Sequence, residues 1–395
     1  MIQLNYGLLN ELSAQYGDSF YIIDTQKLKK DIEDFKSSFS SRCRNSAVAY
    51  SFKTCFLSAV LGVVKACGCM AEVTSEFEYF LAEKMNFKDS EIIINGPFKD
   101  ICISEKIIRG GGMVNIDSLY EAEKIVSRLD ARGLSDAQAG VRCNFNVDGR
   151  PSRFGIDFES GDVEKAVRLL QSSGIKVACL HCHIKAATAD SWKYKVERFL
   201  SLISEQKEKG NLPHLKYIDF GGGYHYGESA LYAGLIANAL NEYRLEDMTV
   251  LTEPGAAAVE GSMLFAAKIV NETVIRGRKY VTMAGCTEDV SAIRRRPPAD
   301  VTAFGGHELK KGTVSVGGYT CMENDIICEV PYLLSAGDFV VFHNTGAYSS
   351  ALRSNFIRSH PAVLTYDDGF SLSRRAGSLD FYFSSAGVGD NEKRS

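Results

Sequence analysis

The sequence lacks the long apolar segment that a membrane-spanning helix requires. No run of about 18 apolar residues occurs anywhere in its 395 residues. The first residues, MIQLNYGLLNELSAQYGDS, have no basic region followed by an apolar core, so we expect no secretory signal peptide. The formal net charge is only −4, which gives no electrostatic reason to expect a nucleic acid or an anionic membrane as a partner.

Cysteine, in contrast, is abundant. The chain has 11 cysteines, an odd number at irregular spacing, and several of them lie inside apolar runs. A free cysteine in such a run behaves as a small core residue. The pattern predicts a reduced, cytoplasmic protein without a disulfide framework.

Short β-rich runs alternate with longer amphipathic segments over residues 20–258. The β-rich runs are FYIID, AVAYSF, MAEVTS, EIIING, GMVNID, AGVRCNFN, VACLHCHI, LKYIDFGGG and MTVLTEP. Such alternation predicts an α/β domain with a parallel sheet, and this number of strands fits a closed (β/α)8 barrel. An open, doubly wound sheet is the alternative. Farther along, runs such as DIICEVPYLLSAGDFVVF predict a mostly antiparallel β domain built from residues 1–19 and 259–395.

Polar residues lie at the predicted C-terminal ends of the barrel strands, where the functional groups of such barrels gather. They are Lys53, Glu72, Ser75, Arg142, His181, His183, Gly221, Gly222, Gly223 and Glu253. Three consecutive glycines expose N–H groups to a phosphate, or they simply form a tight turn. A carboxylate such as Glu253 needs a cationic or N–H partner, which an ordinary salt bridge also provides.

The segment CLHCHI contains two histidines and two cysteines but does not have the spacing of a metal site. Neighbouring residues of a strand point to opposite faces, so the four side chains do not surround one ion. We therefore expect no metal, and either a histidine stacked on a ring-shaped ligand or a hydrogen-bonded core histidine. In the β domain, Cys321 is either a reactive thiol or a small buried residue, and Tyr348 either a site residue or a surface aromatic.

A lysine, a glycine-rich anion site, a carboxylate and a flat histidine on one face of a barrel suit pyridoxal 5′-phosphate (PLP). The order of the motifs resembles that of the fold type III PLP-dependent decarboxylases, which include ornithine, arginine, diaminopimelate and carboxynorspermidine decarboxylases. The similar segments, between about residues 20 and 365, are AYSFKT, AEVTSEFEY, INGPFK, RCNFN with PSRFGID, HCHIKA, GGGY, EPG, GYTCMEND, TGAYSS and SNFIRSHPAVL.

This resemblance implies a role for each matching residue. Lys53 would be the Schiff-base lysine, and His183, rather than His181, would stack on the cofactor ring. The implied cofactor-binding set is Lys53, Glu72, Arg142, His183, Gly222, Gly223, Glu253 and Tyr348. Cys321 would be the general acid, contributed by the neighbouring subunit of a homodimer with shared sites. Substrate contacts would come from Met322, Glu323 and Asp325.

Three departures from the family pattern affect the substrate and the phosphate. Ala256 stands where the family usually has an arginine after Glu-Pro-Gly, and Ala186 replaces a frequent serine. Phosphate binding would then depend on Gly222, Gly223 and Tyr348, with help from Thr188 or Lys185. Met322 replaces the acidic residue that reads the distal amine of the substrate. We therefore expect a decarboxylase for an amino acid, or a conjugate of one, with a non-standard distal group, in polyamine, siderophore or antibiotic biosynthesis.

Two alternatives to a decarboxylase remain. An amino-acid racemase of the alanine-racemase type shares the barrel, but such racemases pair the pyridine nitrogen with arginine, and Glu253 argues against that. A binding protein without PLP, like the antizyme inhibitors, is favoured by Ala186 and Ala256. The presence of Lys53, His183, Glu253 and Cys321 weighs more heavily for an enzyme.

Overall fold

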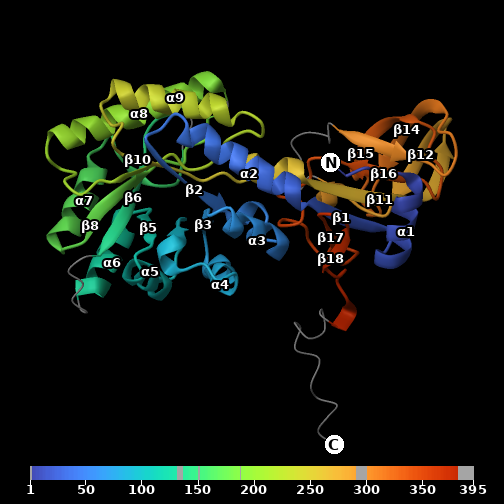
Figure 1. Cartoon of the computed structure of the whole chain (residues 1–395), viewed down its shortest axis with the longest axis horizontal. Coiled ribbons are helices and arrows are strands. Elements are labelled where there is room, and N and C mark those ends of the chain that lie inside the picture. The colour runs from blue at the N-terminus through green and yellow to red at the C-terminus, as the bar shows by residue number, and fades with distance from the viewer. Residues whose placement is uncertain (1, 131–136, 150–151, 187, 291–299, 381–395) are drawn as a thin grey trace, which may run out of the picture. The chain divides into compact units, whose positions relative to one another are not determined.

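The computed structural model describes residues 2–130, 137–149, 152–186, 188–290 and 300–380. The chain divides into two compact units: residues 29–258 form one, and residues 1–28 together with 259–395 form the other. Each unit is built around a sheet of its own (Figure 1). Within the described residues, we find no helix with the length and apolar character needed to span a membrane.

Eight parallel strands form a closed ring in the unit of residues 29–258. β2 pairs with β3 and with β10, and the pairing of β5 with β6 closes the ring. The (β/α)8 barrel is therefore confirmed, and the open sheet is excluded. The strands are β2 (Asn45–Ser51), β3 (Met70–Val73), β4 (Ile92–Ile94), β5 (Met113–Ile116), β6 (Gln138–Asn144), β8 (Lys176–His181), β9 (Tyr217–Asp219) and β10 (Thr249–Thr252), with the two-residue β7 (Ile156–Asp157) beside β6.

Helices cover the outside of this ring (Figure 1). α7 shows the pattern, with Val163, Ala166, Val167 and Leu170 buried at a spacing of three and four residues. The helices are α2 (Thr25–Ser40), α3 (Ser58–Ala66), α4 (Glu76–Lys84), α5 (Ile101–Arg109), α6 (Leu119–Asp130), α7 (Asp162–Ser172), α8 (Ala189–Glu208), α9 (Ser229–Glu242) and α10 (Ala256–Val259), with the 3-10 turns η1 (Phe52–Thr54) and η2 (Asp89–Glu91).

The barrel strands are buried on both faces, which explains their nearly continuous apolar sequences. Ala49, Ile93, Met113, Ala178, Cys179 and Leu251 form an apolar cluster contributed by five strands. Polar residues appear where the strands end, so the chemistry of this unit is confined to the C-terminal mouth of the barrel.

The other unit is a mostly antiparallel sheet with the strand order β15-β14-β12-β11-β1-β17-β18, and β16 joins β11 to β13. Leu9 and Leu12 of α1 pack with Phe20, Phe339 and Leu364 in its core. The elements are α1 (Tyr6–Tyr16), β1 (Ser19–Asp24), η3 (Glu260–Ser262), β11 (Met263–Ile275), β12 (Arg278–Met283), α11 (Thr287–Val290), β13 (Val301–Phe304), β14 (Lys311–Gly317), β15 (Ile326–Tyr332), β16 (Phe339–Phe342), β17 (Ala362–Tyr366) and β18 (Phe370–Arg374).

The first predicted strand differs from expectation. We expected FYIID to open the barrel, but β1 pairs with β11 and β17 in the antiparallel sheet. Phe20 lies opposite Ala266 and Ala362, both more than 240 residues away along the chain. A local strand–helix pattern does not reveal which sheet a strand joins, because that choice depends on partners this distant.

Candidate active site

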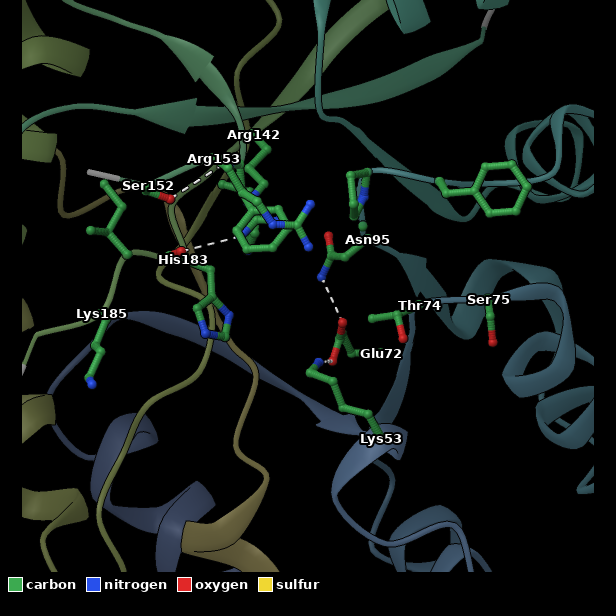
Figure 2. Close-up of a pocket in the computed structure, with 16 residues that line it drawn as sticks. Lys53, Glu72, Thr74, Ser75, Asn95, Arg142, Ser152, Arg153, His183 and Lys185 are labelled. Carbon is green, nitrogen blue, oxygen red and sulfur yellow. Dashed lines mark hydrogen bonds and ion pairs between the residues drawn. The ribbon is translucent and has the colours of Figure 1, made fainter. Parts of the chain in front are cut away.

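A cavity of about 720 Å³ opens at the C-terminal ends of the barrel strands. Its wall includes Lys53, Glu72, Asn95, Arg142, Arg153 and His183, and Figure 2 shows these side chains facing a common space. They follow or end β2, β3, β4, β6 and β8, together with the loop after β6. Residues distant in the sequence thus meet because parallel strands of one barrel end at the same rim.

Lys53 and Glu72 form an ion pair on the floor of this cavity. The register of β2 and β3 places Ser51 beside Glu72, and Lys53 lies two residues beyond Ser51 in η1. Lys53 Nζ also lies 3.4 Å from Ser51 Oγ, to which it donates a hydrogen bond. The Glu72 side chain is 1% exposed while that of Lys53 is 32% exposed, so the amine is the accessible member of the pair.

Glu253 follows β10 and is fully buried beneath the two histidines. Its Oε2 lies 3.4 Å from His181 Nε2 and 3.8 Å from His183 Nδ1. Burial alone would raise the pKa of Glu253, but His181, His183 and Lys53 hold that pKa well below its usual value. Glu253 is therefore an ionised carboxylate, and its Oε2 has no hydrogen bond from any described residue.

Asn95 connects the two carboxylates. Its amide Nδ2 donates to Glu72 Oε1 at 3.0 Å and to Glu253 Oε1 at 2.6 Å. The buried Asn115 of β5 donates to Asn95 Oδ1 at 2.9 Å, which fixes the orientation of the Asn95 amide. Lys99 in turn donates to the backbone oxygen of Asn115 at 3.0 Å.

The three glycines after β9 lie against the histidines. A Cβ on Gly222 would come within 2.8 Å of the Glu253 backbone oxygen and 3.2 Å of His183 Cε1, so only glycine allows this close approach. Gly222 N donates to His183 Nδ1 at 3.3 Å. Gly221 N donates to Asp219 Oδ1 at 2.9 Å, and burial followed by the charge of Glu253 raises the pKa of Asp219 well above its usual value. Asp219 therefore holds its proton more tightly than Glu253 does.

Arg142 lies across the cavity from Lys53. It pairs with Asp117 at 3.0 Å and donates to the backbone oxygen of His183 at 3.3 Å. Its guanidinium carbon is 4.8 Å from the centre of the Phe154 ring, and that of Arg153 is 4.1 Å from the same ring. Phe154 thus holds two guanidinium groups at one wall of the cavity.

The residues predicted to contact the substrate lie in the β unit. Cys321 and Glu323 are exposed, and Met322 is 37% exposed. Asp325 is different, because its oxygens accept hydrogen bonds from Thr287 at 2.6 Å and Thr320 at 2.6 Å. Those contacts hold the buried Asp325 carboxylate in place beside Met322, and its contact with a substrate stays a prediction.

Tyr348 lies in a tight loop of the β unit. It has φ of +61°, a left-handed conformation that is costly for a bulky residue and concentrates at functional sites. The loop is held by Gly346, whose N donates to the Glu260 backbone oxygen at 3.2 Å. A Cβ on Gly346 would come within 2.0 Å of the Val259 backbone oxygen. The backbone around Tyr348 is thus tightly packed and fixes the conformation of this loop.

Two residues considered for the phosphate have different environments. Thr188 caps α8 by accepting from Ser191 N at 3.1 Å, so its hydroxyl is already used within the helix. Lys185 is exposed and makes no ion pair with a described residue. Ala256 begins α10 and offers no charge.

His181, His183 and Glu253 each present a potential ligand atom, and these atoms lie within 4.8 Å of one another. Glu253 lies 70 residues beyond His183, so the spacing within the CLHCHI segment gave no sign of it. Asn115 could have been found from the sequence, since a polar residue inside the apolar strand MVNI is unusual, but we did not predict it. Asp219 and Asp117 were also missed, and both follow the same rule of polar residues at strand ends.

A closed (β/α)8 barrel with a lysine–carboxylate pair, a buried ionised glutamate and a glycine loop at its mouth defines a barrel enzyme of the PLP-binding class. The profile described as "Pyridoxal-dependent decarboxylase, pyridoxal binding domain" matches residues 25–260. The chain therefore belongs to the pyridoxal-dependent decarboxylases, which are carboxy-lyases, and its cofactor is PLP.

Similar proteins cover nearly the whole chain. Diaminopimelate decarboxylase of Methanocaldococcus jannaschii is 26% identical over 92% of this chain and 90% of its own, and that of Bacillus methanolicus is 24% identical over 92% and 91%. The M. jannaschii structure in complex with L-lysine superposes with a TM-score of 0.85 at 21% identity, covering 95% of this chain and 93% of its own. Lysine/ornithine decarboxylase of Vibrio vulnificus with putrescine has a TM-score of 0.77 at 20% identity, covering 92% and 98%. At these identities the structures establish the fold.

The residues of the barrel mouth fit PLP. The ionised Glu253 Oε2 without a hydrogen bond suits a protonated ring nitrogen. The open backbone at Gly223, where an added Cβ would meet only Trp192 at 3.7 Å among the described residues, suits a phosphate. Lys53 provides an accessible amine.

Proposed function

We propose that Lys53 is the covalent attachment point of PLP in an α-decarboxylase whose substrate is an amino acid, or a conjugate of one, with a non-standard distal group. The observation that carries this proposal is the convergence of Lys53, Glu72, His183 and Glu253 on one cavity. All four side chains lie at the C-terminal ends of barrel strands, so none has to move far to reach a cofactor bound in the barrel mouth.

The proposed roles follow from charge and position. Glu253 holds the proton of the ring nitrogen, His183 lies against the ring, and the backbone of Gly222 and Gly223 binds the phosphate. Tyr348 is proposed as a further phosphate ligand. When bound, PLP withdraws electrons from the bond between the substrate's Cα and its carboxylate.

Glu72 and Arg142 are proposed to position these groups. Glu72 keeps the Lys53 amine oriented toward the cavity through their ion pair. Arg142 supports the backbone of His183 and is itself neutralised by Asp117. Neither residue needs to change its protonation state for the reaction.

Cys321 is proposed as the acid that delivers a proton to the substrate's Cα after carbon dioxide has left. In the proposed homodimer this thiol comes from the neighbouring subunit, and Met322 and Glu323 accompany it. Cys321 is exposed, as a thiol that serves another subunit must be. We expect the Cys321→Ala variant to retain PLP and to lose turnover by 10²-fold or more, the usual range of acid–base catalysis.

The proposal is tested on the purified protein supplied with PLP. The wild type should absorb near the edge of the visible range. It should release carbon dioxide from a suitable α-amino acid and should not invert the configuration of the unreacted substrate. Lys53→Ala should lose both the absorbance and the reaction. Lys193→Ala, an exposed lysine of α8, is the matched control and should lose neither. A Lys53→Ala protein that kept the absorbance would refute the assignment, and inversion without carbon dioxide release would favour a racemase.

A further inference from the structure

The loop that carries Cys321 has an exposed tip on a base that is partly buried. It joins β14 to β15, and residues 321–324 at its tip are all exposed. The two ends of the loop meet, because Gly318 N donates to the Asp325 backbone oxygen at 2.8 Å. Exposed loop tips are usually among the most mobile parts of a fold. A side chain on such a tip keeps one orientation only if the base of the loop is held from within the protein.

Asp325 makes one connection between this base and the rest of the β unit. Its carboxylate accepts hydrogen bonds from the hydroxyl groups of Thr287 and Thr320, both at 2.6 Å, and from Thr287 N at 2.9 Å. Thr287 is the first residue of the short helix α11, so Asp325 joins the loop to that helix. Tyr319 N also donates to the Gly285 backbone oxygen at 3.0 Å, just before α11.

A buried guanidinium makes a second connection to the loop. Arg353 Nη2 donates to the Tyr319 hydroxyl at 2.7 Å, and Arg353 Nε pairs with the carboxylate of Asp289. The two side chains of this ion pair are each 1% exposed. The Asp289 carboxylate also accepts from Cys286 N at 2.9 Å, which fixes it within α11. Arg353 therefore connects Tyr319, two residues before Cys321, to the same short helix.

The buried pair of Arg353 and Asp289 contributes more to geometry than to stability. An ion pair withdrawn from water adds little net stability, because desolvation offsets most of the attraction between its charges. The planar guanidinium, however, directs its N–H groups at Asp289 and Tyr319 at once. We propose that Arg353 is a positioning residue: through Tyr319 it holds the Cys321 loop in one conformation, so that the thiol is oriented before the substrate's Cα needs its proton. This inference rests on the proposed function, because it takes Cys321 to be the acid.

Tyr319→Phe tests the connection to the loop while keeping the ion pair of Arg353 with Asp289. Turnover is measured with the PLP-loaded protein as carbon dioxide release from the α-amino acid that reacts fastest with the wild type. We expect kcat to fall about tenfold, with KM and the affinity for PLP changed less than about threefold, because a misplaced acid slows the chemical step and not binding. Tyr21→Phe is the matched control and should keep wild-type turnover, since the Tyr21 hydroxyl donates to the Asp289 backbone oxygen at 2.8 Å and not to the loop.

A double variant separates positioning from a general loss of structure. If Tyr319 acts through the thiol, Cys321→Ala combined with Tyr319→Phe should be no slower than Cys321→Ala alone, because no thiol is left to misplace. A side chain that merely stabilises the fold would instead add its own loss to that of Cys321→Ala.

Hydrogen exchange gives a readout that needs no substrate. The backbone N–H groups of Gly318, Tyr319 and Asp325 are hydrogen-bonded in the structure. They should exchange at least about tenfold faster in Tyr319→Phe than in the wild type or in Tyr21→Phe, because a loop released from its base opens more often. Arg353→Lys keeps the charge but not the planar set of donors, and its exchange should fall between.

Two results would overturn this inference while leaving the decarboxylase assignment intact. One is wild-type exchange of the loop in Tyr319→Phe, and the other is an additive loss of turnover in the double variant. Failure of the proposed function looks different, because it appears without any change at Tyr319. Either Cys321→Ala alone keeps wild-type turnover, or Lys53→Ala keeps its absorbance.

Discussion

Asn95 donates its amide N–H to Glu253 at 2.6 Å, and the same nitrogen donates to Glu72 at 3.0 Å. The neutral Asn95 therefore lies between Glu72, which pairs with Lys53, and Glu253, which is proposed to face the ring nitrogen. Asn95 is an amide and does not titrate. The two carboxylates are thus held apart by a donor whose charge is the same at every pH.

Replacing Asn95 tests this arrangement. Asn95→Ala leaves two buried carboxylate oxygens without a donor, at a cost of about 1–3 kcal/mol, and a loss of that size in kcat/KM is roughly 5- to 150-fold. Asn95→Asp adds a third negative charge and should in addition weaken PLP binding. Asn95→His should introduce a new titration into the pH profile. The readouts are the affinity for PLP by absorbance and kcat/KM across pH, with Asn241→Ala on the exposed face of α9 as the control. Unchanged pH profiles in both Asn95→Asp and Asn95→His would contradict the assignment.

Asp219 provides a second test, because its pKa is raised by burial and by Glu253. If the Asp219 carboxyl is neutral in the folded protein, Asp219→Asn replaces it with a group of the same shape and charge. The Asn oxygen still accepts from Gly221 N, so we expect PLP affinity and the pH profile to change less than threefold. Asp219→Leu removes the acceptor and should weaken PLP binding at least tenfold. A large pH shift in Asp219→Asn would mean that Asp219 is ionised.

Gly222→Ala tests the glycine loop. The added methyl group would lie 2.8 Å from the Glu253 backbone oxygen, and backbone does not move aside easily. We expect PLP affinity to fall at least tenfold and the free energy of unfolding to fall by about 1–3 kcal/mol. Gly234→Ala, in α9 with nothing within 4 Å of its Cβ, should instead gain about 0.5–1 kcal/mol. Normal PLP binding by Gly222→Ala would show that the loop has room to spare.

The barrel could be predicted from sequence because its strands follow one another along the chain and each is followed by a helix. The site residues at strand ends were predictable for the same reason, since parallel strands bring their ends together. β1 could not be placed, because its partners Ala266 and Ala362 give no local signal. The role of Asn95 was equally hidden, because it depends on distances to two residues on other strands.

Lys195 shows another limit of sequence reasoning. It lies on α8, among Lys193, Glu197 and Arg198, in a stretch that resembles a solvated helix face. In the structure it is fully buried, with Nζ 3.3 Å from the centre of the Trp192 ring, and Nζ donates no hydrogen bond to a described residue. Only the packing of α8 against the barrel distinguishes this lysine from its exposed neighbours.

The stability of the protein should therefore depend on pH through Lys195. Burial lowers the pKa of Lys195 to about 8, from 10.5 in an exposed lysine. Below pH 8 the amine is charged in both states, and burying that charge costs about 3 kcal/mol, part of which the Trp192 face offsets. Between about pH 8 and 10.5 the unfolded chain binds the proton and the folded protein does not, so the cost is relieved and stability rises with pH.

Lys195→Met removes this cost while keeping the packing of the side chain. We expect the variant to be more stable than the wild type by about 1–3 kcal/mol at pH 7, and the difference to shrink toward pH 10. Denaturant unfolding at pH 7, 8, 9 and 10 measures it, with Lys193→Met on the exposed side of the same helix as the control. A variant that is less stable than the wild type by the same amount at every pH would mean that the Lys195 ammonium is well solvated or paired in the folded protein. The stability difference thus reports directly on the charge of Lys195.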